Sequence, residues 1–235
     1  CKFTLAGHSD IIMCISFAPE KSMVASVSGD GTFRLWDLTA RRCLHTVDWE
    51  CGPVNLCTIT KYGSDRQNAL VTCHWDVHRE SSRILVWDLE GNLGWANGHL
   101  VSHVMHFEGF AGKITCLDST DNGDSVLLAA GCADGTVKVC DLTEMISLYD
   151  LTGQHTPTLG LSRSITALQF SPNGELLATA GLDGKVHVWE TEEGAHRVTF
   201  FGHQGKVCCV DWKPCGSKLV SCGQDKTIKV WACKF

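Results

Sequence analysis

The sequence lacks the features that mark membrane-spanning or nucleotide-binding chains. No apolar run reaches the roughly 18 residues that a membrane helix needs, and residues 1–10 lack the charged-then-apolar order of a signal peptide. Neither the phosphate loop GxxxxGK(S/T) nor a GxGxxG motif after a strand-like run is present. These absences predict a chain that neither spans a membrane nor cradles phosphates.

Positive charge is scarce. The chain has 20 Lys and Arg against 26 Asp and Glu, which gives a net charge of −6. Binding to the phosphate backbone of nucleic acid needs a basic face. The charge balance therefore predicts no direct, sequence-specific contact with nucleic acid.

Cysteine is abundant, but the paired spacing of a zinc site is missing. None of the 14 cysteines forms a CxxC pair, and many lie in apolar, strand-like runs such as Ile12–Phe17 and Val207–Trp212. A thiol in such a run behaves as a small hydrophobic side chain, so we expect free thiols and a reducing compartment, cytoplasmic or nuclear. The densest set of ligand types is Cys73–His78, where His74 and His78 are four apart and would share a face only on a helix. We therefore expect neither a metal ion nor a cofactor.

A repeated motif is the strongest signal that the sequence does contain. His8 precedes Asp30 by 22 positions and Asp30 precedes Trp36 by six, and the same two spacings relate His203, Asp225 and Trp231. Weaker copies place Trp87, Cys140 and Trp189 at the Trp position between these two units. The chain therefore divides into five repeats, about residues 1–40, 41–91, 92–144, 145–193 and 194–235, within a single domain.

Each repeat has the pattern of short strands joined by tight turns. In the first, the runs Ile12–Phe17, Met23–Ser28 and Thr32–Asp37 are separated by turn residues, among them Gly29-Asp30-Gly31. The fourth repeats this order with Ile165–Phe170, Leu176–Ala180 and Val186–Trp189. No stretch shows a sustained helical period, so the fold class is all-β.

The residues Gly7-His8, Ser26, Asp30 and Trp36-Asp37 resemble the WD40-repeat β-propeller family. The resemblance covers almost the whole chain. It implies four-stranded antiparallel blades around a channel, with a sequence repeat that is offset from the blade. Lys2–Leu5 would then be the outermost strand of a blade, and the five visible blades would form either a closed ring or part of a larger propeller.

The same resemblance implies a buried, hydrogen-bonded set of His, Ser or Thr, Asp and Trp in each complete blade. Burying these polar groups is tolerable only if each finds a partner. Position by position, the expected members are His8, Ser26, Asp30, Trp36, Thr72, Asp76, Trp87, Asp134, Thr179, Asp183, Trp189, His203, Ser221, Asp225 and Trp231.

Three units depart from this pattern at the His position. Glu50 occupies it in unit two and Leu161 in unit four, whereas unit three keeps only Asp134, with Phe110, Ala130 and Cys140 at the other places. We therefore expect unit three to pack through apolar contacts.

The residue types of His8, Ser26 and Asp30 match a catalytic triad. The resemblance buries them inside a blade, however, and the same set recurs in unit five, which is typical of a scaffold element. The sequence therefore predicts no enzyme and no catalytic residues.

The remaining candidates lie on one surface. In the resembled family, partners bind where the loop leading into each blade and the turn that holds the Asp emerge together. By position, these partner-binding candidates are Ile11, Met13, Pro53, Asn55, Trp75, Lys113, Thr115, Ser164, Thr166, Leu182, Lys206, Cys208 and Gln224. Ile11, Met13, Trp75 and Leu182 are apolar where water is expected, and Trp and Met are enriched in interface cores.

The function we expect is a non-catalytic protein–protein interaction scaffold or sensor module of a larger intracellular protein. It would bind proteins or peptides through this surface and be part of a larger chain or complex. The alternative is a propeller module of an RNA- or ribonucleoprotein-processing complex, and a propeller enzyme is the least favoured.

Overall fold

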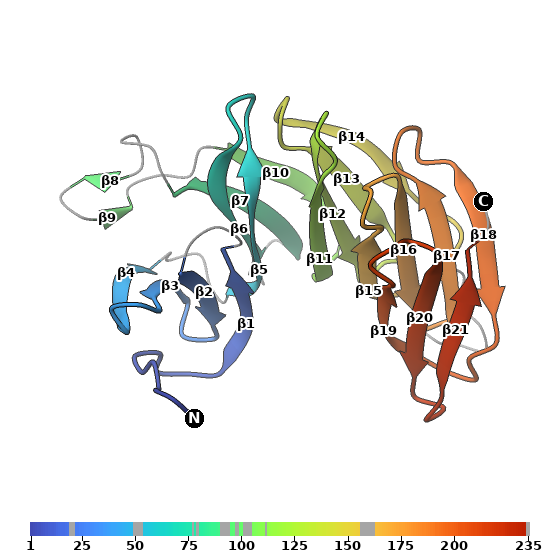
Figure 1. The fold of residues 1–235 in the computed structure, drawn as a ribbon, viewed down its shortest axis with the longest axis horizontal. Coiled ribbons are helices and arrows are strands. Elements are labelled where there is room, and N and C mark those ends of the chain that lie inside the picture. The colour runs from blue at the N-terminus through green and yellow to red at the C-terminus, as the bar shows by residue number, and fades with distance from the viewer. Residues whose placement is uncertain are drawn as a thin grey trace. The chain divides into compact units, whose positions relative to one another are not determined.

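The computed structural model describes residues 1–18, 22–48, 54–76, 78, 80–89, 95–96, 99–100, 105–110, 112–155 and 163–233. The chain forms two compact units, Cys1–Phe110 and Ala111–Phe235, and each is described by itself (Figure 1). Every regular element in the described residues is a β-strand. No helix that could span a membrane is found among them.

The first unit contains two four-stranded antiparallel sheets, which we call blades one and two. Blade one is built in sequence order from β1 (Ile12–Phe17), β2 (Met23–Ser28), β3 (Thr32–Asp37) and β4 (Arg42–Asp48). Blade two has the order β10-β7-β6-β5, from β5 (Val54–Tyr62), β6 (Gln67–Asp76), β7 (Ser81–Asp88) and β10 (Met105–Phe110). The small hairpin of β8 (Trp95–Ala96) and β9 (His99–Leu100) separates β7 from β10 in the sequence.

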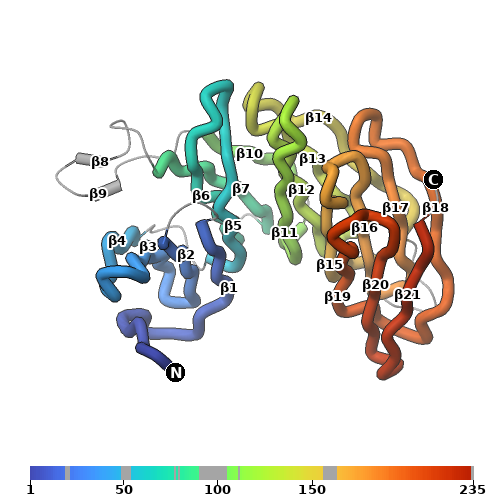
Figure 2. Tube along the Cα trace, viewed as in Figure 1, coloured from blue at the N-terminus to red at the C-terminus, as the bar shows by residue number. Residues whose placement is uncertain are grey.

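The second unit contains blades three, four and five. Blade three comprises β11 (Ile114–Asp121), β12 (Val126–Cys132), β13 (Val137–Asp141) and β14 (Ile146–Leu151). Blade four comprises β15 (Ile165–Phe170), β16 (Leu176–Gly181), β17 (Lys185–Glu190) and β18 (His196–Phe201). Blade five comprises β19 (Val207–Trp212), β20 (Lys218–Gly223) and β21 (Ile228–Ala232). The chain completes each of these sheets before it begins the next (Figure 2).

The expected all-β architecture of short antiparallel strands is confirmed, and the strands of units one and four lie where the turn signals place them. The second and third strands of blades one, three and four are joined by Asp-Gly turns whose glycines, Gly31, Gly135 and Gly184, have φ between 77° and 91°. This left-handed conformation favours glycine, which has no Cβ to clash with the backbone.

The expected strand at Lys2–Leu5 is wrong. These residues belong to no sheet, and the sheet of blade five has three strands in the described part of the chain. An extended segment becomes a strand only when its backbone N–H and C=O groups pair with a neighbouring strand. The apolar alternation of Lys2–Leu5 does not by itself supply that partner.

The innermost strand of every blade begins with the same irregularity. The pairing register with the second strand shifts directly after the first residue of β1, β5, β11, β15 and β19. An extra residue at a bulge increases the local twist and redirects its side chain. The bulged residues are Met13, Asn55, Thr115, Thr166 and Cys208, all of them partner-binding candidates.

Side-chain oxygens fasten neighbouring blades at a fixed position of the innermost strands. In the first unit, the Ile59 backbone N–H donates to Ser16 Oγ of the preceding blade at 2.9 Å. In the second unit, Phe170 N–H donates to Asp118 Oδ2 at 2.8 Å and Trp212 N–H donates to Gln169 Oε1 at 2.8 Å. The fifth residue of one strand thus binds the sixth residue of the next, whatever the chemical type of its oxygen.

Apolar contacts between blades form most of the core within each unit. Two alternate third-strand residues point toward the next blade: Phe33 and Leu35 pack with Val54 and Leu70 of blade two. In the second unit, Val186 and Val188 pack in the same way with residues of blade five.

The equivalent pair in blade five, Ile228 and Val230, is 74% and 60% exposed. On the opposite face of blade one, Ile15 and Phe17 are also exposed, although the equivalent residues of blade four, Leu168 and Phe170, are buried. The blade faces at Ile15 and at Ile228 therefore have the composition of blade interfaces and are not covered by another sheet of their own unit.

The buried contact of Asp118 generates a pH-dependent prediction. Burial raises the pKa of the Asp118 carboxyl to about 6. The backbone hydrogen bonds from Phe170 and Ser119 lower this pKa, but burial has the larger effect. A folded-state pKa above the ordinary value of about 3.9 favours folding below that value, and the advantage is lost as the pH rises through about 6. Asp118→Asn keeps an acceptor for Phe170 N–H without the charge, so we expect it to stabilise the fold by about 1–2 kcal/mol at pH 7.5.

Urea denaturation of both proteins between pH 4 and 8 measures this effect. The gain should disappear near pH 4, where both side chains are neutral. Asp121→Asn, on an exposed residue of the same strand, serves as the control and should change little. Equal destabilisation by Asp118→Asn at every pH would contradict the assignment.

Candidate binding surface and the hydrogen-bonded sets beneath it

Blade one holds the complete set of four hydrogen-bonded side chains. The Trp36 indole N–H donates to Ser26 Oγ at 2.8 Å, Ser26 Oγ lies 2.7 Å from His8 Nε2, and His8 Nδ1 lies 2.9 Å from Asp30 Oδ2. Because the carboxylate can only accept, His8 donates its Nδ1–H to Asp30; in that tautomer Nε2 accepts the Ser26 hydroxyl proton, and Ser26 Oγ accepts from the indole. The chain of donors ties the third strand to the second and to the loop that leads into the blade.

Blade five contains the same set at nearly the same distances. Trp231 donates to Ser221 Oγ at 2.9 Å, Ser221 Oγ lies 2.8 Å from His203 Nε2, and His203 Nδ1 lies 2.9 Å from Asp225 Oδ2. Trp231 is partly exposed, however, whereas Trp36 is buried. The ring of Phe200 stacks on Trp231 at a centroid distance of 4.9 Å.

Blade four also holds a complete set, which corrects the assignment of Leu161 to the His position. His155 supplies the imidazole: its Nδ1 lies 3.1 Å from Asp183 Oδ1 and its Nε2 lies 3.0 Å from Thr179 Oγ1, which accepts from Trp189 at 2.9 Å. The spacing between histidine and first strand in blades one and five does not locate His155, because the segment between His155 and β15 is longer than in those blades. Gly153-Gln154-His155, with glycine two positions before the histidine, was the available signal.

Blade two takes its imidazole from a strand. Trp87 donates to Thr72 Oγ1 at 2.8 Å, and His74 Nε2 lies 2.8 Å from the same oxygen. Since alternate residues of a strand share a face, His74 on β6 reaches the hydroxyl that a loop histidine binds elsewhere. Asp76 accepts the backbone N–H of His78 within the turn, and Glu50 lies outside the described residues.

The three replacements in repeat three are buried, as expected. Ala130 and Cys140 lie in blade three, and Phe110 lies on β10 of blade two. Asp134 is exposed and accepts the backbone N–H of Thr136, so it stabilises the turn alone.

The turn aspartates of blades one and five are held as carboxylates. Burial alone would raise the pKa of Asp30, but hydrogen bonds from Thr32, Ser9 and His8 outweigh it and keep the pKa well below its ordinary value. Asp225 is shifted in the same direction by Thr227, Gln204 and His203.

Backbone hydrogen bonds align the partner-binding candidates at one end of each sheet, which we call the rim. The residue before the turn Asp donates its N–H to the carbonyl of the residue before the innermost strand. Among the described residues, these pairs are Gly29 with Ile11, Ala133 with Lys113, Leu182 with Ser164 and Gln224 with Lys206, at 2.8–3.0 Å. Trp75 occupies the corresponding place in blade two by register.

The rim candidates differ in exposure. Ile11, Met13, Lys113, Cys208 and Gln224 are exposed, whereas Asn55, Trp75, Thr115, Ser164, Thr166, Leu182 and Lys206 are half-buried. Pro53 lies outside the described residues.

Thr115 and Thr166 have a structural contact as well. Thr115 Oγ1 donates to the Ile165 carbonyl of the next blade at 2.6 Å, and Thr166 Oγ1 donates to the Val207 carbonyl at 2.5 Å. Local sequence patterns do not predict these bonds, because they link residues about one repeat apart.

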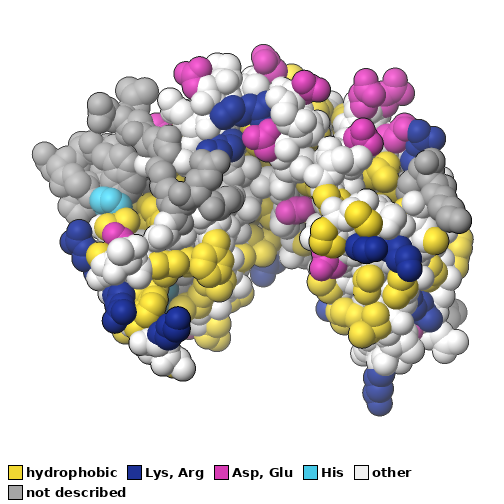
Figure 3. All heavy atoms as spheres, viewed as in Figure 1, with side chains coloured by type: hydrophobic (Ala, Val, Ile, Leu, Met, Phe, Trp, Pro, Cys, Tyr) yellow, Lys and Arg dark blue, Asp and Glu magenta, His cyan; other side chains and the backbone are white. Residues whose placement is uncertain are grey.

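The opposite end of the second unit carries a different surface. A cleft of about 620 Å³ between blades three and four is lined by Asp124, Asp141, Glu175, Glu190 and Glu192, with Leu148 and Arg197 among its other lining residues. Acidic side chains gather over the turn that joins β17 to β18 (Figure 3).

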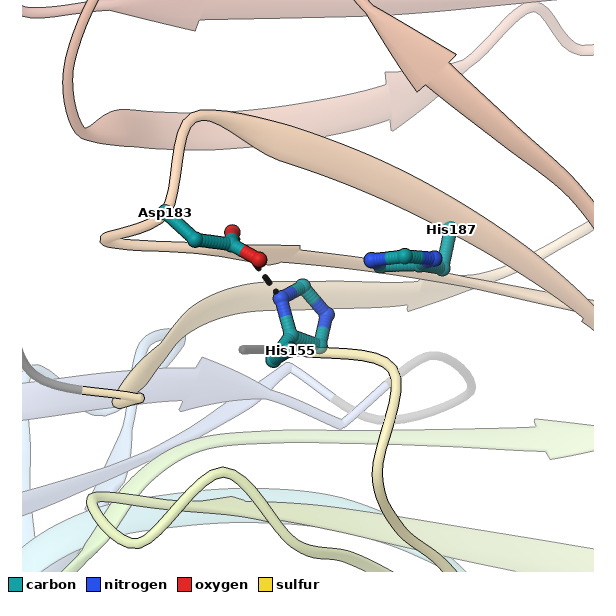
Figure 4. A group of neighbouring side chains, drawn as sticks. All are labelled: His155, Asp183 and His187. Carbon is teal, nitrogen blue, oxygen red and sulfur yellow. Dashed lines mark hydrogen bonds and ion pairs between the residues drawn. The ribbon is translucent and has the colours of Figure 1, made fainter. Parts of the chain in front are cut away.

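Among the described residues, one group of side chains has the composition and spacing of a metal-binding set. His155, Asp183 and His187 of blade four lie close together (Figure 4), and one possible ligand atom from each lies within 4.8 Å of the other two.

None of the cysteines that the structure describes is joined to another.

The sequence profile of the WD domain, G-beta repeat, matches residues 1–37, 101–141, 153–190 and 194–232. The matches cover more than half of the chain, and all four begin ahead of the sheet in which they end. The chain belongs to the WD40-repeat family. The offset of the repeat from the blade is seen directly at 194–232, which begins before β18 of blade four and ends on β21 of blade five.

Relatives of this WD40 chain are longer than it. It is 25% identical to the protein tipD of Dictyostelium discoideum and 28% identical to the WD40 repeat-containing protein HOS15 of Arabidopsis thaliana, each over 98% of the chain. It is 22% identical to the guanine nucleotide-binding protein subunit beta-1 of Nicotiana tabacum. The chain spans 41%, 36% and 58% of these proteins. WD40-repeat proteins generally act as protein-interaction scaffolds, and none of these names indicates catalysis.

The hydrogen-bonded set of blade four generates a stability prediction. Thr179→Val preserves shape but leaves the Trp189 N–H and a His155 nitrogen buried without their partner. We expect a loss of roughly 2–4 kcal/mol in the free energy of unfolding. Chemical denaturation measures it, with Thr152→Val on an exposed residue of the same unit as the control. An unchanged midpoint for Thr179→Val would show that the network contributes nothing.

The carboxylate of Asp30 generates a second prediction, of opposite sign to that for Asp118. Its pKa is lowered in the folded state, so its stabilising effect is present above the ordinary value of about 3.9 and is lost as the pH falls below it. Asp30→Asn should therefore destabilise the protein at pH 7, and the difference from the unsubstituted protein should shrink on acidification below pH 4. Melting temperatures measured across this range test it, and a difference that grows toward low pH would refute the assigned charge state.

Proposed function

We propose that this chain is a non-catalytic protein–protein interaction module of a larger intracellular protein, and that partners bind the rim. The observation that carries the proposal is the exposure of Ile11, 71% of whose surface is open, beside Met13, 47% exposed, at the rim of blade one. Apolar side chains that remain exposed beside a polar border are typical of interface cores.

The rim is also pre-organised for binding. In four blades a backbone hydrogen bond fixes the turn residue beside the residue that leads into the innermost strand. Beneath them, the hydrogen-bonded sets of blades one, four and five hold the turn aspartate in place. A surface that does not need to be ordered on binding loses less conformational entropy when a partner arrives.

Burial argues against catalysis by the His, Ser or Thr and Asp sets. The side chains of His155 and Asp183 are 2% and 0% exposed, and those of His8 and His203 are similarly covered. A substrate has no access to a nucleophile held in this way, and the three recurring sets have the same structural role in each blade.

A role in a ribonucleoprotein complex is the second candidate. Lys113, Arg163 and Lys206 lie at the places where the chain enters blades three, four and five, and basic side chains contact phosphates. The exposed Asp134 on the turn beside Lys113 reduces this positive character, and the exposed Gln224 beside Lys206 adds no charge.

Proximity labelling with the full-length protein tests the proposal. Ile11→Asp and Leu182→Asp place a charge on the rim and should reduce capture of the labelled protein partners about tenfold or more, as expected for loss of an apolar anchor. Leu148→Asp is the matched control, because Leu148 is 39% exposed and lines the acidic cleft at the other end.

Loss of partners in Leu148→Asp, with full capture by both rim variants, would move the binding surface to the cleft. RNA crosslinking that depends on Lys113 and Lys206 would favour the ribonucleoprotein role instead. Melting curves of each variant separate a binding defect from unfolding.

A further inference from the structure

Blade four differs from its neighbours by a second buried histidine. His187 lies on β17 opposite Thr179, and only 1% of its surface is exposed. The residues at the corresponding register position are Arg34 in blade one, Lys138 in blade three and Lys229 in blade five. An imidazole thus replaces a long cationic side chain beside the hydrogen-bonded set.

The group of His155, Asp183 and His187 contains two buried polar atoms that could bind a metal ion, His187 Nε2 and Asp183 Oδ2. Each has almost no accessible surface, and neither has a hydrogen-bond partner among the residues that the structure describes. Buried polar atoms are normally satisfied, so each such exception points to a missing ligand, ion or water. Both atoms belong to the same group of side chains, and His187 Nε2 is directed toward Asp183 and His155 (Figure 4).

Sequence differences explain why Asp183 keeps a free oxygen. In blades one and five, a threonine two positions after the Asp donates its hydroxyl to the carboxylate, and the N–H after the histidine binds the other oxygen. Blade four has Lys185 in place of that threonine, and among the described residues Asp183 accepts hydrogen bonds only through Oδ1, from His155 and the Lys185 backbone.

We propose that blade four binds one divalent transition-metal ion of the zinc class through Asp183 Oδ2, His187 Nε2 and His155 Nδ1. Two imidazole nitrogens and one carboxylate oxygen suit zinc, and a water completes the four positions of the ion. The ion neutralises the carboxylate and satisfies both unpartnered atoms at once.

The surrounding threonines hold both rings in the required orientation. His187 Nδ1 lies 2.9 Å from Thr199 Oγ1, and His155 Nε2 lies 3.0 Å from Thr179 Oγ1. A ligating histidine normally hydrogen-bonds through its other ring nitrogen, which fixes the tautomer. When the ion binds, the His155 proton leaves Nδ1 and Nε2 becomes the protonated nitrogen, which donates to Thr179.

The required movement is small. One possible ligand atom from each of the three residues lies within 4.8 Å of the other two, whereas ligands about 2.0–2.1 Å from a tetrahedral ion are about 3.4 Å apart. Rotation about the side-chain bonds of His187 and Asp183 that moves their ligand atoms by about an ångström each closes this difference. Asp183 lies in the β16–β17 turn, so the ion enters from the rim.

Titration of the full-length protein with Zn²⁺ and with Co²⁺ tests the site. We expect one ion per chain and a tetrahedral Co²⁺ absorption spectrum without the near-ultraviolet charge-transfer band of thiolate ligands. This band matters because the chain has 14 cysteines that could bind either ion.

His187→Lys gives blade four the residue that blades three and five carry and should weaken Zn²⁺ binding at least about 100-fold, since losing even an outer partner costs 10- to 100-fold. His106→Gln is the control. It removes an exposed histidine of β10 in the first unit and should leave the affinity unchanged.

Three results would overturn the proposal: equal Zn²⁺ affinity in His187→Lys, a thiolate charge-transfer band, or no binding at all. If neither ion binds, a bridging water is the partner of His187 Nε2 and Asp183 Oδ2. If His187→Lys does not fold, His187→Gln replaces it, and the Co²⁺ spectrum of the unsubstituted protein decides between the histidine set and the cysteines.

Discussion

The indole N–H of a buried tryptophan must find an acceptor, and the structure of each complete blade depends on how that is met. In blades one, four and five, the indole donates to a second-strand hydroxyl, the hydroxyl binds a loop histidine and the histidine binds the turn aspartate. An unsatisfied polar group of this kind would cost about 1–3 kcal/mol. One requirement therefore joins the third strand, the second strand, the loop and the turn, and it fixes the rim on which the proposed binding surface lies.

The blades meet this requirement in different ways, and their differences indicate where function has been added. Blade three removes the polar groups and fills the space with Ala130 and Cys140, while blade two draws its imidazole from its own second strand at His74. Blade four keeps the full set and adds His187. His187 is a second buried imidazole beside Asp183 Oδ2, which has no hydrogen-bond partner among the described residues, and the proposed metal ion would bind both side chains.

Two layers of contact join neighbouring blades, and they carry different kinds of information. The apolar layer tolerates exchange among Phe, Leu, Ile and Val, because burial depends mainly on apolar area. The polar layer depends on position, since Ser16, Asp118 and Gln169 share only an oxygen directed at the same backbone N–H. Asp118 meets that need with a charge and is the member of this layer whose contribution changes with pH.

The sequence alone determined the family, the all-β class and the strands of the regular repeats, because these depend on local alternation and on turn residues at fixed offsets, as at Gly29-Asp30-Gly31. It also placed the sets of blades one and five, whose loops have standard lengths. It missed His155, because the longer loop before β15 breaks the spacing, and it assigned Lys2–Leu5 to a strand that has no partner. Tertiary structure alone brought His155, Asp183 and His187 together, since they come from a loop, a turn and a strand whose separation in the chain does not reveal their distance in space.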